Sequence, residues 1–192
     1  MANNEVVKEK NTEDDSDYEI LDPQRVFSLL PLRPYQTVAD VWCGAGSFSI
    51  SLGKYLFDGK VYAVDISHPS LRLLKEQLSR IRLGNVETVF SKTKDKIPIK
   101  KNILDGILIA FSLGKVDDQG EFLKNLFSHL RVGGWTAIID WHKKKKGIGP
   151  PLEERFDMSE VISLAKKAGY KFVKDHNLDE NHYLILFRKT GK

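Results

Sequence analysis

The order of apolar segments along the chain is the feature that most limits its possible folds. Short runs rich in β-branched and aromatic residues alternate with longer segments in which apolar residues recur at helical spacing. Repeated strand–helix units of this kind predict a parallel sheet with helices on both faces. The strand-like runs span residues 37–42, 60–66, 85–90, 104–111 and 135–141.

The helical segments between these runs carry residues that commonly begin or end helices. Ser and Asp side chains accept hydrogen bonds from the first backbone N–H groups of a helix, and glycine readily adopts the conformation that ends one. The expected boundaries are Ser47 and Leu56 for the first helix, Ser67 with Pro69 and Gly84 for the second, Asp117 or Asp118 for the start of the third, and Asp157 or Ser159 with Gly169 for the fourth.

The last part of the chain departs from this alternation. Residues 170–176 and 182–188 both resemble strands, and only the segment "NLDEN" separates them. So short a link cannot contain a crossover helix, so the two strands must run antiparallel. We therefore predict a doubly wound, Rossmann-like α/β fold with one seven-stranded mixed sheet and a C-terminal antiparallel hairpin.

Composition sets the expected class of protein. With 192 residues, 41% apolar and 29% charged, a single domain is expected over residues 20–192. Residues 1–19 hold seven acidic side chains and two lysines and are expected to form a mobile tail. No apolar run approaches the roughly 20 residues of a membrane span, and the polar start shows no secretory signal. Because Cys43 is the only cysteine, neither a disulfide nor a multi-cysteine metal site is expected. We predict a cytoplasmic protein.

The segment "VADVWCGAGSFS", residues 38–49, predicts a strand, a glycine turn and a helix start. Such a turn brings the backbone and a helix N-terminus close to a ligand. A dinucleotide is one candidate, because Asp65 lies 19 residues beyond Gly46, where an acid would bind a ribose. However, Ser49 replaces the third glycine of the dinucleotide motif. The turn alone leaves the ligand open.

The same residues resemble the class I S-adenosylmethionine-dependent methyltransferases. Asp40, Gly44 and Gly46 match the acid and the last two glycines of that family's first motif, D-x-G-x-G-x-G, and Asp65 matches the acid of its second motif. The C-terminal hairpin is also a mark of the family. The likeness covers nearly everything after the acidic tail and is strongest to the small methyltransferases grouped with ubiquinone and menaquinone biosynthesis enzymes.

The resemblance implies that S-adenosylmethionine is the cofactor. No metal is expected, because His68, His129, His176 and His182 lack the spacing of metal ligands. Glycines permit close backbone approach, the helix N-terminus suits a carboxylate, and Asp65 would accept hydrogen bonds from the ribose hydroxyls. Trp42 departs from the family's usual glycine, and we interpret it as core packing in preference to a ligand contact. The implied cofactor residues are Asp40, Gly44, Gly46, Ser47, Asp65, Ile66, Lys92, Thr93 and Ala110.

The acceptor of the methyl group is less constrained. The chain lacks the Asp/Asn-Pro-Pro-aromatic motif of amino-group methylases, and it has no second cysteine to act as the nucleophile of RNA pyrimidine methylases. A small organic acceptor is therefore expected. Asp140 and His142 follow the fifth strand-like run and are the candidates for a general base, if the acceptor must lose a proton.

Three other functions stay open at this point. The basic run Lys143–Lys146 would suit an RNA or protein substrate. Trp42 and the absence of a clear base would suit a cofactor-binding protein without turnover. A dinucleotide oxidoreductase is the last alternative. The sequence does not determine the oligomeric state.

Overall fold

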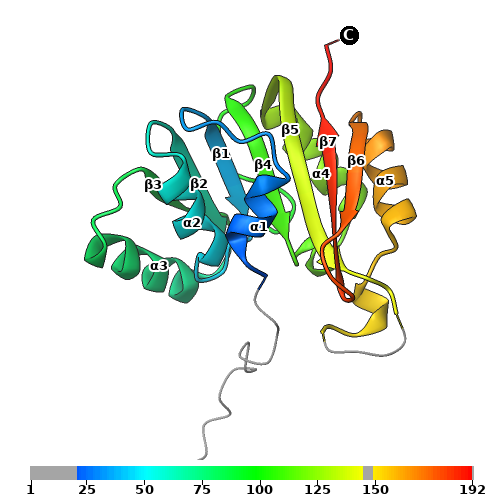
Figure 1. Ribbon diagram of the computed structural model, residues 1–192, viewed down its shortest axis with the longest axis horizontal. Coiled ribbons are helices and arrows are strands. Elements are labelled where there is room, and N and C mark those ends of the chain that lie inside the picture. Colours follow the sequence, from blue (N-terminus) through cyan, green and yellow to red (C-terminus); the bar gives the residue numbers. More distant parts are fainter. Residues whose placement is uncertain (1–20, 145–148, 192) are drawn as a thin grey trace, which may run out of the picture.

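The computed structural model describes residues 21–144 and 149–191. Its centre is a seven-stranded sheet with the order β3-β2-β1-β4-β5-β7-β6 (Figure 1). Adjacent strands are parallel from β3 to β5, and β7 runs antiparallel to both β5 and β6. The predicted mixed sheet and hairpin are confirmed. The strands are β1 (Thr37–Val41), β2 (Lys60–Asp65), β3 (Val86–Phe90), β4 (Leu104–Ala110), β5 (Leu130–Trp141), β6 (Lys171–Asn177) and β7 (His182–Arg188).

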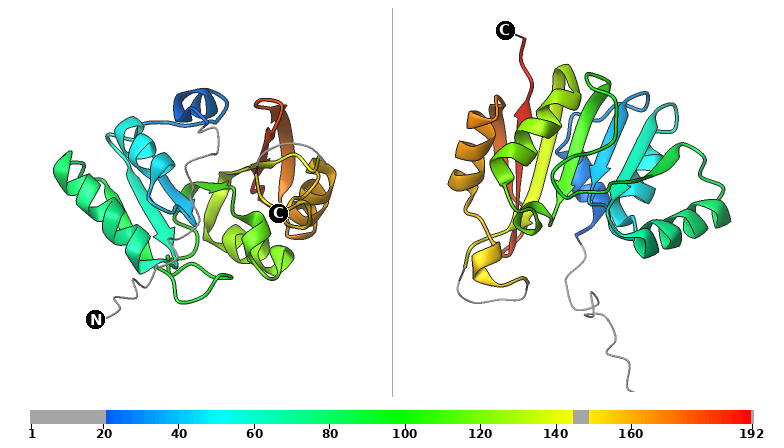
Figure 2. Two further views of the ribbon diagram at one scale, coloured as in Figure 1. Left: turned by 90° about the horizontal axis from the view of Figure 1, so that it is seen from below. Right: turned by 180° about the vertical axis from the view of Figure 1, so that it is seen from behind.

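Helices cover both faces of the sheet. In Figures 1 and 2, α1, α2 and α3 lie on one face, and α4 and α5 lie on the other. There are two short 3-10 turns in the described residues: η2 follows β4, and η3 precedes α5. The bounds are α1 (Pro23–Ser28), α2 (Ser47–Tyr55), α3 (His68–Arg80), η2 (Leu113–Lys115), α4 (Gln119–His129), η3 (Leu152–Glu154) and α5 (Met158–Lys167). The acidic segment 1–19 lies outside the described residues.

Two hydrophobic cores follow from the alternation of side chains along the strands. Leu52 of α2 and Leu74 of α3 belong to the first, which we call the α2-side core, and Phe122 of α4 belongs to the second, the α4-side core. Along β5, Ile139 faces the α2-side core and its neighbour Ile138 faces the α4-side core. Both faces of β4 and β5 are buried, which explains why their sequences are nearly continuous apolar runs.

Several predicted boundaries are confirmed and others are wrong. The Asp118 side chain accepts the Glu121 N–H at 2.9 Å and caps α4, and Asp157 forms a capping box with Glu160 at the start of α5. In contrast, α3 ends at Arg80, and the left-handed residue beyond it is Arg82, with φ of 55°, rather than Gly84.

Two further features were not predicted. The fifth strand begins at Leu130, immediately after α4, instead of at residue 135. Helix α1 lies before β1 and packs Phe27 into the α2-side core. No helix in the described ranges is both long enough and apolar enough to cross a membrane.

Candidate active site

The glycine turn lies at the carboxyl end of β1, next to the carboxyl ends of β2 and β4. Open α/β sheets bind their ligands at this edge, which is the lower edge in Figure 1. Gly44 and Gly46 have φ angles of 54° and 89°, which L side chains rarely adopt. A Cβ on Gly44 would meet no atom of residues 21–144 or 149–191 within 4 Å, whereas one on Gly46 would lie 2.3 Å from Leu74 Cδ1. Gly44 therefore leaves open space, and Gly46 allows α2 to begin close against α3.

Asp65 ties this turn to the end of β2. Its Oδ2 accepts the Gly44 N–H at 2.7 Å, and its Oδ1 accepts the Ser67 N–H at 2.8 Å. The side chain therefore joins the β1–α2 loop to the start of α3. Asp65 remains 7% exposed, and each carboxylate oxygen can accept more than one hydrogen bond. Oxygen lone pairs thus remain for a ligand hydroxyl at this position.

Asp40 lies in β1, before the turn, and contacts the helix that follows it. Its Oδ2 accepts a hydrogen bond from Ser49 Oγ of α2 at 2.5 Å, and the residue is only 2% exposed. Burial raises the pKa of the Asp40 carboxyl to about 6, even though the Ser49 hydrogen bond opposes this and the Asp65 charge adds a little to it. Through its hydrogen bond with Ser49, the Asp40 carboxyl group contacts the first turn of α2.

Trp42 and Phe111 directly follow the last residues of β1 and β4, and both have a left-handed backbone, with φ of 60° and 56°. Both residues therefore break the alternation of their strands. Trp42 turns to the α4-side core and stacks on Phe122, with ring centroids 5.9 Å apart. Phe111 turns to the α2-side core. Left-handed residues of this size are uncommon and concentrate at functional sites. The geometry of Trp42 agrees with its interpretation as core packing.

Lys92 and Thr93 lie beyond β3, beside a hollow. Together with Phe90 and Ile97 they line a cavity of about 280 Å³. The Ser91 hydroxyl donates to the Lys96 carbonyl at 2.6 Å and holds this loop in place. The hollow lies beside Phe90, which is paired with Asp65 in the β2–β3 ladder.

The remaining predicted cofactor residues lie at the same edge of the sheet. Ser47 begins α2, and Ala110 is the last residue of β4. Ile66 follows Asp65 and is 39% exposed. His68, two residues further, stacks on the Phe90 ring with centroids 3.6 Å apart. The structure thus brings the predicted cofactor residues to the ends of four adjacent strands.

Asp140 and His142 end up on the α4 side of the sheet. Asp140 is 3% exposed, and its Oδ1 accepts the Trp141 N–H at 2.8 Å. Its Oδ2 has no hydrogen-bond partner among the described residues. Burial raises the Asp140 pKa to about 7. His142 is half-buried beside Tyr183, with ring centroids 5.3 Å apart, and burial together with the Lys144 charge lowers its pKa.

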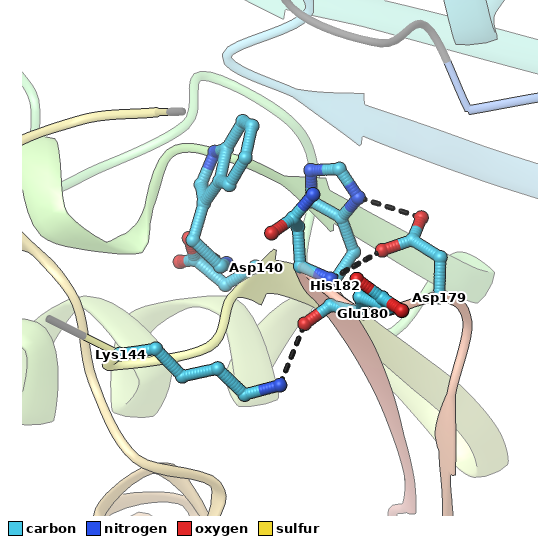
Figure 3. Close-up of polar contacts among 7 residues, drawn as sticks. Asp140, Lys144, Asp179, Glu180 and His182 are labelled. Atoms are coloured by element: carbon cyan, nitrogen blue, oxygen red, sulfur yellow. Dashed lines mark hydrogen bonds and ion pairs between the residues drawn. The ribbon is translucent and has the colours of Figure 1, made fainter. Parts of the chain in front are cut away.

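The described part of the basic run makes contacts within the protein. Lys143 Nζ lies 3.5 Å from Glu160 Oε2. Lys144 Nζ donates to the Glu180 carbonyl at 2.7 Å, as Figure 3 shows. Lys145 and Lys146 lie outside the described residues. Lys143 and Lys144 therefore both contact other parts of the folded chain.

His182 is a further candidate for a general base, which the sequence analysis did not identify. It begins β7 and lies opposite Trp141 in the β5–β7 ladder. Its Nδ1 lies 2.8 Å from Asp179 Oδ2 (Figure 3). The spacing of three residues between an Asp and a His is the one sequence signal for this pair. Among the described residues, no group of three or more His, Cys, Asp or Glu side chains is arranged to hold a metal ion.

Comparisons with known proteins place this geometry in context. Residues 24–184 match the model of the ubiE/COQ5 methyltransferase family. Over 128 residues, the chain is 30% identical to the ubiquinone/menaquinone biosynthesis C-methyltransferase UbiE of Escherichia coli O1:K1. That match covers 66% of this chain and 49% of the relative, so the chain spans about half the length of the curated relatives it matches.

Solved structures share the fold. A SAM-dependent methyltransferase from Aquifex aeolicus superimposes with a TM-score of 0.83 at 31% identity, covering 91% of this chain and 93% of that one. Phosphoethanolamine N-methyltransferase 2 from Haemonchus contortus, solved in complex with S-adenosyl-L-methionine, gives a TM-score of 0.72 at 14% identity. It covers 88% of this chain and 52% of that one, and at this identity it supports the fold alone.

Proposed function

The chain belongs to the ubiE/COQ5 methyltransferase family, and on that premise we propose that it is an S-adenosylmethionine-dependent methyltransferase with a small-molecule acceptor. One observation supports this most directly. Gly44 has a left-handed backbone, open space where a Cβ would be, and an N–H fixed by Asp65. A turn built this way suits a ligand that lies against the backbone and places its ribose beside the same carboxylate.

The residues at this edge fit the cofactor. Ser47, at the N-terminus of α2, would bind the methionyl carboxylate, and Gly44 would let the ligand lie close against the backbone. Asp65 would accept the ribose hydroxyls. Ile66 and the hollow beside Lys92 and Thr93 would hold the adenine. Asp40 positions α2 through Ser49, and Gly46 sets its distance from α3. Ala110 would lie beside the methionyl part.

The bound cofactor supplies an electrophilic methyl group on a sulfonium, so the protein has little covalent chemistry to perform. Holding the acceptor in line with the methyl group provides most of the acceleration. A base is needed only where the acceptor must lose a proton. Asp140 and His142 remain candidates for that base. Asp140 Oδ2 has no hydrogen-bond partner within the described ranges, and the Asp140 pKa of about 7 would allow it to exchange a proton near neutral pH.

The acceptor class rests on the relatives. Their printed name, ubiquinone/menaquinone biosynthesis C-methyltransferase, makes the ring carbon of a hydroquinone the first acceptor to test. Aromatic side chains support a planar acceptor, because Phe111 and Trp141 meet at this edge with centroids 5.9 Å apart. Contacts of Lys143 and Lys144 within the fold give no support to an RNA or protein substrate. Cytoplasmic location stays a prediction.

A labelling experiment tests the proposal. The protein is incubated with methyl-labelled S-adenosylmethionine and 1,4-dihydroxynaphthalene kept reduced, and in parallel with fractionated cell extract. We expect label to pass to a small organic product and S-adenosylhomocysteine to accumulate. Label in RNA or protein fractions would contradict the small-molecule acceptor. A protein that binds the cofactor but labels no fraction would support the alternative without turnover.

A further inference from the structure

His182 is a fully buried histidine in which one ring nitrogen has a hydrogen-bond partner and the other has none among the described residues. The residue is 0% exposed. Its Nδ1 lies 2.8 Å from Asp179 Oδ2, while Nε2 has no hydrogen-bond partner in residues 21–144 and 149–191. Buried polar atoms are nearly always paired, so an unpaired one calls for a physical explanation. A ligand that hydrogen-bonds to Nε2 provides one.

Asp179 is held firmly enough to fix the orientation of the imidazole. Its other oxygen, Oδ1, accepts the backbone N–H groups of Asn181 and His182 at 2.7 and 2.8 Å. Burial acts to raise the Asp179 pKa, but hydrogen bonds from the His182 ring and from these N–H groups outweigh it and lower the pKa. An ionised carboxylate only accepts hydrogen bonds. In a neutral His182 ring, the proton therefore sits on Nδ1, and Nε2 carries a lone pair.

The ring lies on the same side of the sheet as the glycine turn. Along β7, Leu184 faces the α2-side core, and alternation places His182 on that side too. Asp140 and His142 belong to the opposite side. Because β7 is antiparallel, its first residue lies at the same edge of the sheet as the ends of β1 and β4.

Aromatic rings connect His182 to the end of β4. Phe111 lies edge-on to the His182 ring with centroids 5.3 Å apart, and Trp141 does so at 4.0 Å. Phe111 directly follows Ala110, which the family resemblance places beside the methionyl part of the cofactor. The left-handed conformation of Phe111 is what turns its ring toward His182 rather than toward α4.

We propose that His182 Nε2 takes the proton that the methyl acceptor gives up, with Asp179 as the positioning residue; this inference rests on the proposed methyl transfer. The acceptor atom forms a bond to the methyl carbon, and the carbon–sulfur bond breaks with its electron pair on sulfur. The acceptor proton goes to Nε2, and the resulting imidazolium is stabilised by the Asp179 carboxylate and returns the proton to water. Near this pair, His142 interacts electrostatically with Asp179, His182 and Lys144, and Arg155 lies over the Trp141 ring that contacts His182.

The first test reads the tautomer and the ligand contact directly. Nitrogen-15 NMR of the protein loaded with S-adenosylhomocysteine should show His182 with the proton on Nδ1. Phenol, a planar hydroxyl compound, is then titrated in. We expect a saturable shift of the His182 Nε2 resonance and no shift at His176, a histidine on β6. A proton on Nε2, or a His182 signal that phenol leaves unchanged, would overturn the proposal.

The second test changes the tautomer while keeping the turn. In Asp179→Asn, the side-chain oxygen can still accept the Asn181 and His182 N–H groups, but the amide nitrogen donates to Nδ1 and moves the ring proton to Nε2. Single-turnover transfer to reduced 1,4-dihydroxynaphthalene should fall at least 100-fold, with the dissociation constant of S-adenosylmethionine unchanged. Asp175→Asn, an exposed change on β6, is the matched control and should react like the wild type.

The variants also separate this inference from the proposed function. His182→Ala should be inactive and partly rescued by added imidazole, which a purely structural role would not produce. Wild-type turnover in Asp179→Asn would refute the proton-acceptor role while leaving methyl transfer intact. Failure of the wild type to bind S-adenosylmethionine would refute the proposed function instead. If the naphthalenediol is no substrate, only that acceptor is excluded, and the NMR titration still decides the role of Nε2.

Discussion

The Asp65 carboxylate accepts the backbone N–H of Gly44 at 2.7 Å, and this contact links the second strand of the sheet to the glycine turn after the first. The same carboxylate also accepts the Ser67 N–H at the start of α3. One side chain therefore sets the relative positions of two loops that surround the proposed cofactor site. This gives Asp65 two roles, as a support of the turn and as the proposed ribose ligand.

Replacing Asp65 should affect both roles. We expect Asp65→Ala to weaken S-adenosylmethionine binding at least tenfold, since each hydrogen bond to a charged group contributes about 1.5–3 kcal/mol. Isothermal calorimetry measures the affinity, and circular dichroism checks that the fold is retained. Asp58→Ala, on an exposed loop, is the control. Unchanged affinity would remove Asp65 from the site.

The two glycines of the turn should respond differently to alanine. Gly44→Ala adds a methyl group to open space and should cost roughly 1–2 kcal/mol for its left-handed backbone, with a large loss of cofactor binding. Gly46→Ala places a methyl group against Leu74 and should cost more stability, about 1–3 kcal/mol from packing alone. Thermal melts and calorimetry on both variants separate the effects. Equal affinity of Gly44→Ala and wild type would contradict its role.

Trp42→Phe should leave most of the cofactor binding intact. The ring packs against Phe122 on the α4 side, away from the α2 side of the turn. A smaller ring leaves a gap, and we expect a loss of roughly 1–3 kcal/mol in the free energy of unfolding. Denaturant titration measures that loss. If the variant loses the cofactor at unchanged stability, Trp42 is a ligand contact after all.

Asp140 should make the stability depend on pH with a definite sign. Burial raises its folded-state pKa to about 7 from 3.8, so the folded state holds this proton more tightly than the unfolded state does. The contribution of Asp140 to the free energy of unfolding is complete below about pH 4. As the pH rises to about 7, up to ~4 kcal/mol of this contribution is lost. The stability difference between wild type and Asp140→Asn should therefore fall over that range. A pH-independent difference would show that Asp140 ionises normally.

The sequence predicts the strands, the parallel part of the sheet and the antiparallel hairpin well, because apolar alternation and a five-residue link constrain them strongly. It also predicts which residues gather at the carboxyl edge of the sheet. It does not predict where α3 ends, because Arg82 adopts a left-handed conformation that glycine usually takes. Local patterns carry no information on such exceptions.

The face on which a side chain lies was harder to predict at the strand ends. Trp42 and Phe111 each have a positive φ that no sequence motif indicates, and this backbone places each ring on the face of the sheet opposite to the one expected from strand alternation. The pairing of His182 with Asp179 arises only once the β6–β7 turn folds and buries the His182 ring beside the partly exposed Asp179 carboxylate. The sequence pointed to Asp140 and His142 for the same role, since they directly follow a strand at the expected edge. The structure adds a third candidate on the opposite face.

The central claim is that the turn at Gly44 binds S-adenosylmethionine. The most direct test is calorimetric titration of this compound into the wild type and into the variant Gly44→Val, with a titration of NAD into the wild type for comparison. We predict saturable one-site binding of S-adenosylmethionine to the wild type, no binding of NAD, and no binding of S-adenosylmethionine to a folded Gly44→Val variant. Binding of NAD alone, or equal S-adenosylmethionine affinity in wild type and Gly44→Val, would contradict the account.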